Sequence, residues 1–304
     1  MSILKSKYFK FGLSMCLSVL ILYYLYKGTS ISEVSGEIKL LNPYFFSGFV
    51  ILILVQLIIA VCRWKYITGK LAEYKINFSE SAQLVIGSYS ANLIIPAKMG
   101  EFIRVIWEKN KEKRKQILKL VFFEKILDVF SLYLIYALTL TFVLNTDTRV
   151  KLYLISVVIP IISSLLFLLL LKNRKITMLL PKKVSEFISL LKTLFSEKRK
   201  FFYRIIFISL LLWIIQVGQF IFIFLSANVS PGLVEAYAGN SLAILAGAFI
   251  PSIGGIGPRD ATIIWFFDGL ASDMLLTTIG LISALRIIIP ALIGLPFFFN
   301  LTRK

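Results

Sequence analysis

The sequence predicts an all-α polytopic membrane protein with a single integral-membrane domain over residues 1–304. Hydrophobic residues make up 58% of the chain and the mean hydropathy is +0.84, whereas an average soluble domain is about 45–50% apolar. The one or two cores of a soluble protein of this length could not bury so much apolar surface. The apolar residues also fall in long runs between short charged segments.

Six of these runs are long enough to cross a bilayer, since a spanning helix needs about 20 largely apolar residues. The six spans are expected at 9–27, 43–62, 117–145, 151–171, 205–226 and 275–300. Two further apolar runs, 80–96 and 236–251, are shorter and end at Pro96 and Pro251. Proline breaks a helix. Glycine and charged residues follow both Pro96 and Pro251, so the two short runs need a separate explanation.

Lysine and arginine predict the orientation. The net charge is +18, and the cations cluster beside the spans, as in cytoplasmic loops that face anionic lipid. A nucleic-acid partner is therefore not expected. Lys5 and Lys10 place the N-terminus in the cytoplasm, and Arg303 and Lys304 place the C-terminus there. We expect a multi-pass protein of the cell membrane, with the basic stretch 172–204 lying along the inner leaflet as amphipathic helix.

The two short runs are expected to be re-entrant. Cytoplasmic charge flanks 80–96 on both sides, at Lys75 and at Lys111, so this run cannot cross only once and should enter and return. Glu235 and Asp268 flank the run 236–251, which indicates entry from the outside. The chain then divides into halves 1–150 and 151–304 of opposite orientation, an inverted-topology repeat typical of secondary transporters. Two ordinary short spans are the alternative and stay open at this point.

The composition excludes several kinds of chemistry. The chain has no histidine and two cysteines, Cys16 and Cys62, which fall in or at the ends of apolar runs. A zinc site or a disulfide framework needs more such residues. No phosphate-binding loop of the Gly-x-x-x-x-Gly-Lys-Ser/Thr type is present. We expect neither a metal nor a cofactor.

Each short run leads into a polar constellation. Both combine a proline, a glycine four residues later and a nearby acid–arginine pair. Glycine lets another group approach the backbone closely, and the start of the next helix offers N–H groups to an anion such as a lipid phosphate. A simple turn with a local acid–arginine pair is the alternative. The segments are Pro96-Ala-Lys98-Met-Gly100-Glu101-Phe-Ile-Arg104 and Pro251-Ser-Ile-Gly254-Gly255-Ile-Gly257-Pro258-Arg259-Asp260.

Three ionisable residues fall deep in predicted spans. Glu124 and Asp128 lie one turn apart on one helix face, and Asp128 lies about 16 Å from the start of its span at 1.5 Å per residue. Arg286 reaches about 18 Å by the same arithmetic. Because an unpaired charge there costs at least ~2.5–3.5 kcal/mol, we expect an acid of this pair to contact Arg286. Whether that contact is structural or part of a substrate path stays open. Arg63, with Trp64 and Lys65, is interpreted as an interfacial anchor.

Taken in order, these motifs resemble the flippase-like transmembrane family. The matching residues are Asn92, Pro96, Gly100, Glu101, Arg104, Glu124, Asp128, Pro251, Gly254, Gly255, Gly257, Arg259 and Asp260. This family includes the membrane region of lysylphosphatidylglycerol synthase, also called multiple peptide resistance factor. Lys98 stands where the family pattern suggests arginine, and Asp260 where it more often has glutamate. The soluble aminoacyl-transferase domain of the two-domain synthases is absent from the sequence.

The resemblance implies a lipid-translocating core. The expected substrate is an anionic or zwitterionic lipid, or a glycolipid linked through polyprenyl phosphate. Arginines would hold the headgroup phosphate, and carboxylates would orient them or exchange protons. The candidate substrate-binding residues are Lys98, Glu101, Arg104, Glu124, Asp128, Gly255, Arg259, Asp260 and Arg286. A membrane glycosyl transferase that uses polyprenyl-phosphate sugars is the alternative, with Glu124 and Asp128 as acid and base. An accessory subunit of an envelope complex and a homo-oligomer both stay open.

Overall fold

A computed structural model describes residues 30–71, 75–95, 99–108, 110–143, 198–249 and 254–302, together with Tyr23, Lys27 and Ser252. Its regular elements in these ranges are all helices. The helices of the first half are α2 (Ile31–Lys39), α3 (Pro43–Leu71), α4 (Phe78–Ile94), the 3₁₀ turn η2 (Met99–Phe102), α5 (Ile103–Trp107) and α6 (Lys111–Val143). Those of the second half are α10 (Arg199–Ser226), α11 (Leu233–Phe249), α12 (Pro258–Phe266), α13 (Asp273–Ser283) and α14 (Leu285–Thr302).

Local sequence explains where the shorter helices begin. Asn77 accepts a hydrogen bond from the Glu80 backbone N–H, and the Glu80 side chain accepts one from the Asn77 N–H. This reciprocal capping box satisfies two N–H groups at the start of α4. Helix α12 starts with Pro258 at its first position, where a missing N–H costs nothing and the fixed φ suits a helix.

Three described helices are long and apolar enough to cross a bilayer by length and composition, namely Pro43–Leu71, Arg199–Ser226 and Asp273–Leu301. They confirm helices at the predicted spans 43–62, 205–226 and 275–300, and α6 places a helix over most of 117–145. Helix α3 continues nine residues beyond the predicted end at residue 62. The predicted spans 9–27 and 151–171 and most of the basic stretch 172–204 lie outside the described residues.

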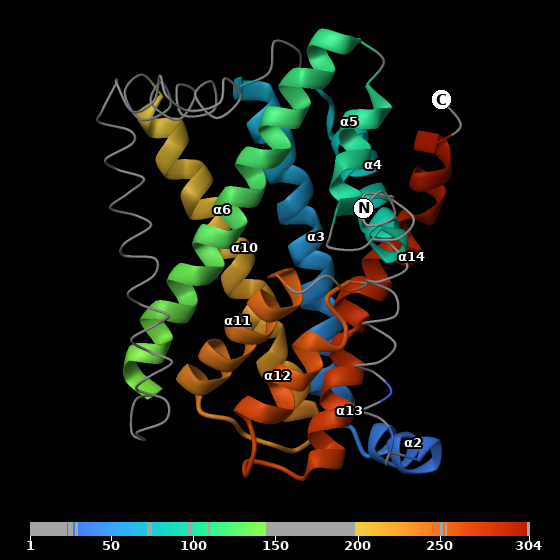
Figure 1. Ribbon diagram of the computed structural model, residues 1–304, viewed down its shortest axis with the longest axis vertical. Helices are drawn as coiled ribbons and strands as arrows, with labels where there is room; N and C mark the ends of the chain where they lie inside the picture. Colours follow the sequence, from blue (N-terminus) through green and yellow to red (C-terminus); the bar gives the residue numbers. More distant parts are fainter. Residues whose placement is uncertain are drawn as a thin grey trace, which may run out of the picture.

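The two short runs form broken helical pairs at opposite ends of the molecule. Helices α4 and α5 lie in the part that also holds the end of α14, whereas α11 and α12 lie at the other end, beside the start of α13 (Figure 1). Each short run ends within the bundle, and a second short helix leads the chain back toward the end from which it came (Figure 1).

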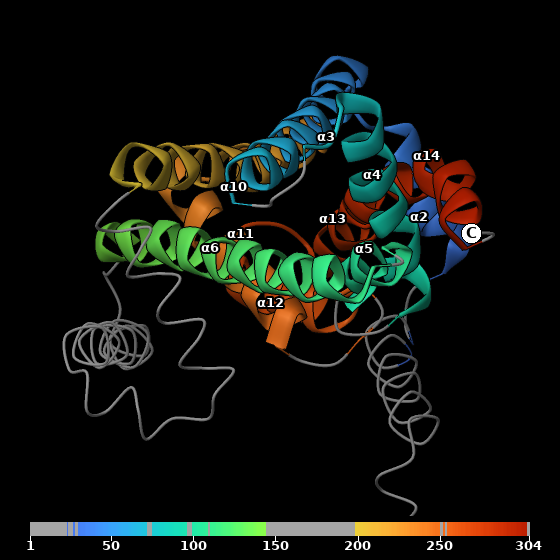
Figure 2. The same cartoon turned by 90° about the horizontal axis from the view of Figure 1, so that it is seen from above.

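The long helices pack in pairs around the broken ones. Helix α3 packs against α10, α4 against α14, and α11 against α6. Seen from above, α3 and α10 form one row and α6 with α11 lies across from it (Figure 2). Gly294 of α14 permits the close approach of α4, because a Cβ there would lie 2.3 Å from the Ile86 carbonyl oxygen. Ser90 of α4 also donates a hydrogen bond of 2.6 Å to the Ala291 carbonyl.

This close contact yields a stability prediction. Gly294→Ala should lower the free energy of unfolding by about 1–3 kcal/mol, because the methyl group must push two backbones apart. Gly69→Ala is the matched control, since a Cβ at Gly69 meets nothing within 4 Å and alanine stabilises a helix by about 0.5–1 kcal/mol relative to glycine. Thermal unfolding of both purified variants in detergent measures the difference. Equal melting temperatures would contradict the packing described for α4 and α14.

Candidate functional site

A cavity of about 120 Å³ lies between the two broken helical pairs. Side chains from both halves of the chain form its walls. Five cationic groups and four carboxylates lie on these walls or directly behind them within the described residues: Arg63, Arg104, Lys125, Arg259 and Arg286 against Glu101, Glu124, Asp128 and Asp260. The volume is well below the ~300–1,000 Å³ of a pocket that encloses a whole small molecule. A cavity of this size cannot enclose a whole lipid molecule.

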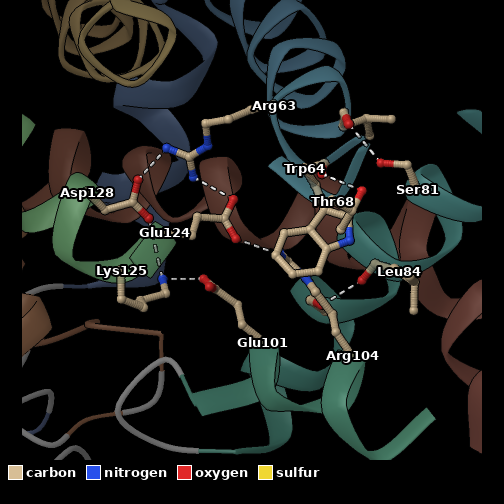
Figure 3. Close-up of polar contacts among 12 residues, drawn as sticks. Arg63, Trp64, Thr68, Ser81, Leu84, Glu101, Arg104, Glu124, Lys125 and Asp128 are labelled. Carbon is tan, nitrogen blue, oxygen red and sulfur yellow. Dashed lines mark hydrogen bonds and ion pairs between the residues drawn. The ribbon is translucent and has the colours of Figure 1, made fainter. Parts of the chain in front are cut away.

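Arg63 of α3 is the centre of the charged network. Its Nη1 donates to Asp128 Oδ1 at 2.6 Å and its Nη2 to Glu124 Oε1 at 2.8 Å (Figure 3). The planar guanidinium can reach two carboxylates at once because its N–H groups form a rigid fork. Arg63 is only 4% exposed, so the pair of carboxylates supplies the compensation that a buried cation needs.

The two carboxylates connect Arg63 to three further elements. Glu124 Oε2 accepts a hydrogen bond of 2.5 Å from Arg104 of α5. Asp128 Oδ1 accepts one of 2.9 Å from the indole N–H of Trp213 on α10. Arg104 also donates to Ser88 of α4 and lies 4.5 Å from the ring centroid of Trp64. The network therefore fixes α3, α4, α5, α6 and α10 relative to one another.

Lys125 lies at the more accessible edge of this network. Its ammonium group pairs with Glu101 of η2 and lies 3.7 Å from Asp128 Oδ2 (Figure 3). The Lys125 side chain is 32% exposed, whereas that of Arg63 is 5% exposed. Glu101 and Lys125 thus link the turn after α4 to α6 at the more exposed edge of the network.

The second half contributes a compact acid–arginine pair at the start of α12. Arg259 donates through Nε and Nη2 to Asp260 Oδ1 at 2.9 and 2.7 Å. Asp260 Oδ2 accepts a hydrogen bond from the Gly257 N–H at 3.2 Å. The carboxylate of Asp260 therefore occupies the helix start that the sequence suggested for an external anion. Arg259 lines the cavity, and Asp260 holds it from behind.

Gly255 has a steric role in this half. Its φ is +79°, and a Cβ there would lie 2.9 Å from the Gly247 carbonyl oxygen. Gly247 in turn would place a Cβ 2.9 Å from the Gly255 carbonyl oxygen. Only glycine satisfies both the backbone conformation and the close approach. The two residues allow the segment before α12 to pack directly on α11 at the cavity wall.

Arg286 of α14 differs from the other arginines. It is 6% exposed, and within the described residues no carboxylate lies within ion-pair distance of it. Its guanidinium donates to the carbonyls of Ser283 and Gln216 at 3.3 Å and to Asn240 Oδ1 at 3.5 Å. It also lies 5.5 Å from the ring centroid of Phe220. These contacts are long and come from neutral groups, so Arg286 brings an uncompensated positive charge to the cavity.

Amide side chains form a chain of hydrogen bonds between α3 and α10. Gln56 Nε2 donates to Gln216 Oε1 at 2.7 Å, and Gln219 Nε2 donates to Gln56 Oε1 at 2.7 Å. These residues lie at the interface of α3 and α10, and Gln56 and Gln216 face the cavity. Gln56 and Gln216 therefore add neutral polar groups to the cavity wall.

Two sequence-based expectations about charge pairing are wrong. Glu124 and Asp128 contact Arg63 and not Arg286, because α3 and not α14 packs its polar face against this part of α6. Arg63 is not an interfacial anchor, since α3 runs on to Leu71 and places it eight residues, about 12 Å, before the helix end. Lys98 lies outside the described residues. The other candidates, Glu101, Arg104, Glu124, Asp128, Gly255, Arg259 and Arg286, all line the cavity, with Asp260 behind Arg259.

Sequence reasoning missed several residues of the cavity wall. Arg63, Lys125, Trp213, Gln216 and Tyr89 all line it. The sequence does contain a signal that Arg63 lies inside the bundle. Gln56 lies seven residues earlier on the same helix face, and the apolar Ile67 one turn later indicates that the helix continues. The aromatic and amide residues carry no such signal, because single polar groups in apolar helices are common.

The helices and their buried charges define an integral-membrane protein with an internal polar cavity. The chain matches the family described as lysylphosphatidylglycerol synthase TM region over residues 11–294. It therefore belongs to this family, and a role connected with membrane lipids follows from the membership. No match was found among curated proteins.

Removal of Arg63 should destabilise the protein. Arg63→Gln leaves Glu124 and Asp128 facing each other with less compensation, and removing one partner of a buried ion pair costs about 3–5 kcal/mol. Lys65→Gln, on the same helix but exposed, should have little effect. Thermal unfolding in detergent gives the comparison. The triple variant Arg63→Gln, Glu124→Gln, Asp128→Asn should recover part of the loss, and a stable single variant would argue against the network.

Proposed function

We propose that this protein translocates an anionic or zwitterionic membrane lipid, or a polyprenyl-phosphate-linked glycolipid, between the leaflets of the cell membrane. The observation that carries the proposal is Arg286, a buried arginine without a carboxylate partner among the described residues, on the wall of a cavity shared by both halves. A buried charge is costly unless it is paired, and a lipid phosphate supplies the missing partner. Arginine suits phosphate because its N–H groups contact two oxygens.

The packing of the helices supports an inverted repeat of residues 1–150 and 151–304. If α3, α4 and α6 correspond to α10, α11 and α13–α14, then the contact of α4 with α14 corresponds to that of α11 with α6. Helices α3 and α10 are equivalent in this scheme, and they contact each other. The proposed re-entrant segments are α4 with α5 and α11 with α12, which enter from opposite sides. Substrate sites of such transporters lie at the interface of the two repeats, and residues from both halves of this chain line the cavity.

The proposed orientation places both termini in the cytoplasm. Lys111, Lys113 and Arg114 at the start of α6 then face the anionic inner leaflet, and Asp273 at the start of α13 faces outside. A homo-oligomer would be compatible with this arrangement.

The carboxylate contacts favour transport over glycosyl transfer. A general base needs a carboxylate that can accept a proton from the substrate. Glu124 and Asp128 each accept hydrogen bonds from two groups in the network, among them Arg63. Their contacts therefore suit a fixed structural charge. A transferase would also leave a new covalent product, which the transport assay below can detect.

The orientation can be tested by cysteine labelling. In a background that lacks Cys16 and Cys62, single cysteines at the exposed positions Ser79 and Lys111 should react with an impermeant maleimide only from the cytoplasm. A cysteine at Asp273, which is also exposed, should react only from outside. Labelling of Ser79 and Lys111 from opposite sides would show that α4 crosses the membrane and would exclude the re-entrant proposal.

The transport proposal can be tested with Arg286→Gln. Proteoliposomes that carry a fluorescent anionic phospholipid should show leaflet exchange about tenfold slower or more, given the usual strength of a hydrogen bond to a charged group. Melting temperature should be unchanged or higher, because the variant removes an uncompensated buried charge. Arg204→Gln, an exposed arginine on α10, is the control and should exchange lipid normally. Unaltered exchange by Arg286→Gln would contradict the assignment.

A further inference from the structure

The outer face of α3 changes from apolar to basic toward the end of the helix. Because spacings of three and four residues keep side chains on one helix face, an exposed stripe runs along α3 and reaches Cys62, Lys65 and Gly69. In a bilayer the apolar part of this stripe lies against the lipid chains, which remove it from water. The exposed apolar side chains of the stripe are Ile51, Leu54, Val55 and Ile58.

An open pocket of about 330 Å³ lies at the basic end of the stripe. The last turns of α3 and the start of α4 form its walls. Gly69 leaves space in it, because a Cβ there would meet nothing within 4 Å. The pocket is separate from the central cavity, since no described residue lines both. Its lining residues are Cys62, Lys65, Tyr66, Gly69, Lys70 and Phe78.

The pocket carries positive charge that the described part of the chain does not balance. Lys65 and Lys70 are exposed, and no described carboxylate lies within ion-pair distance of either ammonium group. The Lys198 ammonium adds a third cation at this end of α3, 3.0 Å from the Lys70 carbonyl oxygen. The Tyr66 ring stacks on Phe201 of α10, with 5.2 Å between the ring centroids. Basic pockets between membrane helices on the cytoplasmic side are suited to anionic lipid headgroups.

We propose that this pocket binds an anionic phospholipid of the surrounding leaflet, with its phosphate at Lys65 and Lys70 and its acyl chains along the apolar stripe of α3. In the orientation proposed above, this is the cytoplasmic leaflet. Ile58 and Lys65 lie seven residues, about 10 Å, apart along the helix, so the chains and the headgroup of one lipid reach both. A free phosphate would make only the second contact. The bound lipid stays at the outer surface, so the inference goes beyond the proposed translocation through the cavity.

Photocrosslinking can locate this lipid. The protein in phosphatidylcholine nanodiscs receives a trace of phosphatidylglycerol or phosphatidylcholine with the same diazirine-bearing acyl chain, and mass spectrometry maps the labelled peptides. Phosphatidylglycerol should label the α3 stripe about tenfold more than phosphatidylcholine, because each nearby lysine strengthens the binding of an anionic lipid about fivefold. Equal labelling by the two lipids would overturn the inference.

Variants separate the pocket from general surface charge. Lys65→Gln with Lys70→Gln should reduce phosphatidylglycerol labelling to the phosphatidylcholine level. The matched control is Lys111→Gln with Lys113→Gln, at the same end of the molecule on α6 (Figure 1), and should label normally. Gly69→Leu keeps both pocket lysines but fills the space beside them, so it should lower the labelling as well. Undiminished labelling in either pocket variant would overturn the inference.

The variant Arg286→Gln makes the test independent of the cavity. Phosphatidylglycerol should label the α3 stripe of this variant as strongly as that of the unmodified protein, even where lipid exchange is slow. Loss of the labelling would show that it reports lipid at the cavity, and would overturn the inference. Normal labelling without lipid exchange by the unmodified protein would support the pocket and count against the transport proposal alone.

Discussion

Charge compensation in a low-dielectric interior is the constraint on which this structure depends. Arg63 can lie inside the bundle only because Glu124 and Asp128 face it at 2.8 and 2.6 Å. These carboxylates in turn can lie there only because Arg63, Arg104 and Lys125 surround them. Since removal of any one group strands the others, the network fixes the relative positions of five helices. The cavity next to it is therefore preformed, and its wall charges are held at defined positions.

The same constraint explains why Arg286 is informative. A stable membrane helix disfavours a charge that nothing balances, and Arg63 and Arg104 in the first half each pair with a carboxylate. Asp260 lies behind Arg259 and forms an ion pair with it, and among the described residues it forms none with Arg286. The positive end of the cavity thus lies on the side of α12 and α14. On the proposed function, stability and lipid binding make opposite demands at Arg286, because a charge that is left free for a ligand costs stability.

The sequence was sufficient to predict what depends on short-range patterns. Run length predicted the helices over 43–62, 117–145, 205–226 and 275–300, and the two prolines predicted where the short runs 80–96 and 236–251 end. The partner of Glu124 and Asp128 could not be predicted, because depth along a span does not tell which helix packs beside it. Depth along the predicted spans favoured Arg286 as the partner of Glu124 and Asp128. Arg63 was not expected as their partner, because its span was expected to end at residue 62. The described candidate residues still lie at one cavity, because ionisable side chains in membrane helices face the interior of the bundle or a polar cavity.

Around the cavity, the ion pairs among the described residues lie within one half of the chain or the other, whereas the polar contacts between the halves are hydrogen bonds to neutral groups, and this difference affects how the halves can move. If the two halves rock against each other, as the halves of inverted-repeat transporters do, contacts at the α3–α10 interface must be broken and remade. Gln56, Gln216 and Gln219 lie there, and amides can exchange partners because each both donates and accepts. Most ion pairs, such as Glu124 with Arg104 and Arg259 with Asp260, stay within one half. The Trp213–Asp128 and Arg63–Ser209 hydrogen bonds join the halves at the charged network, so such a movement must break both.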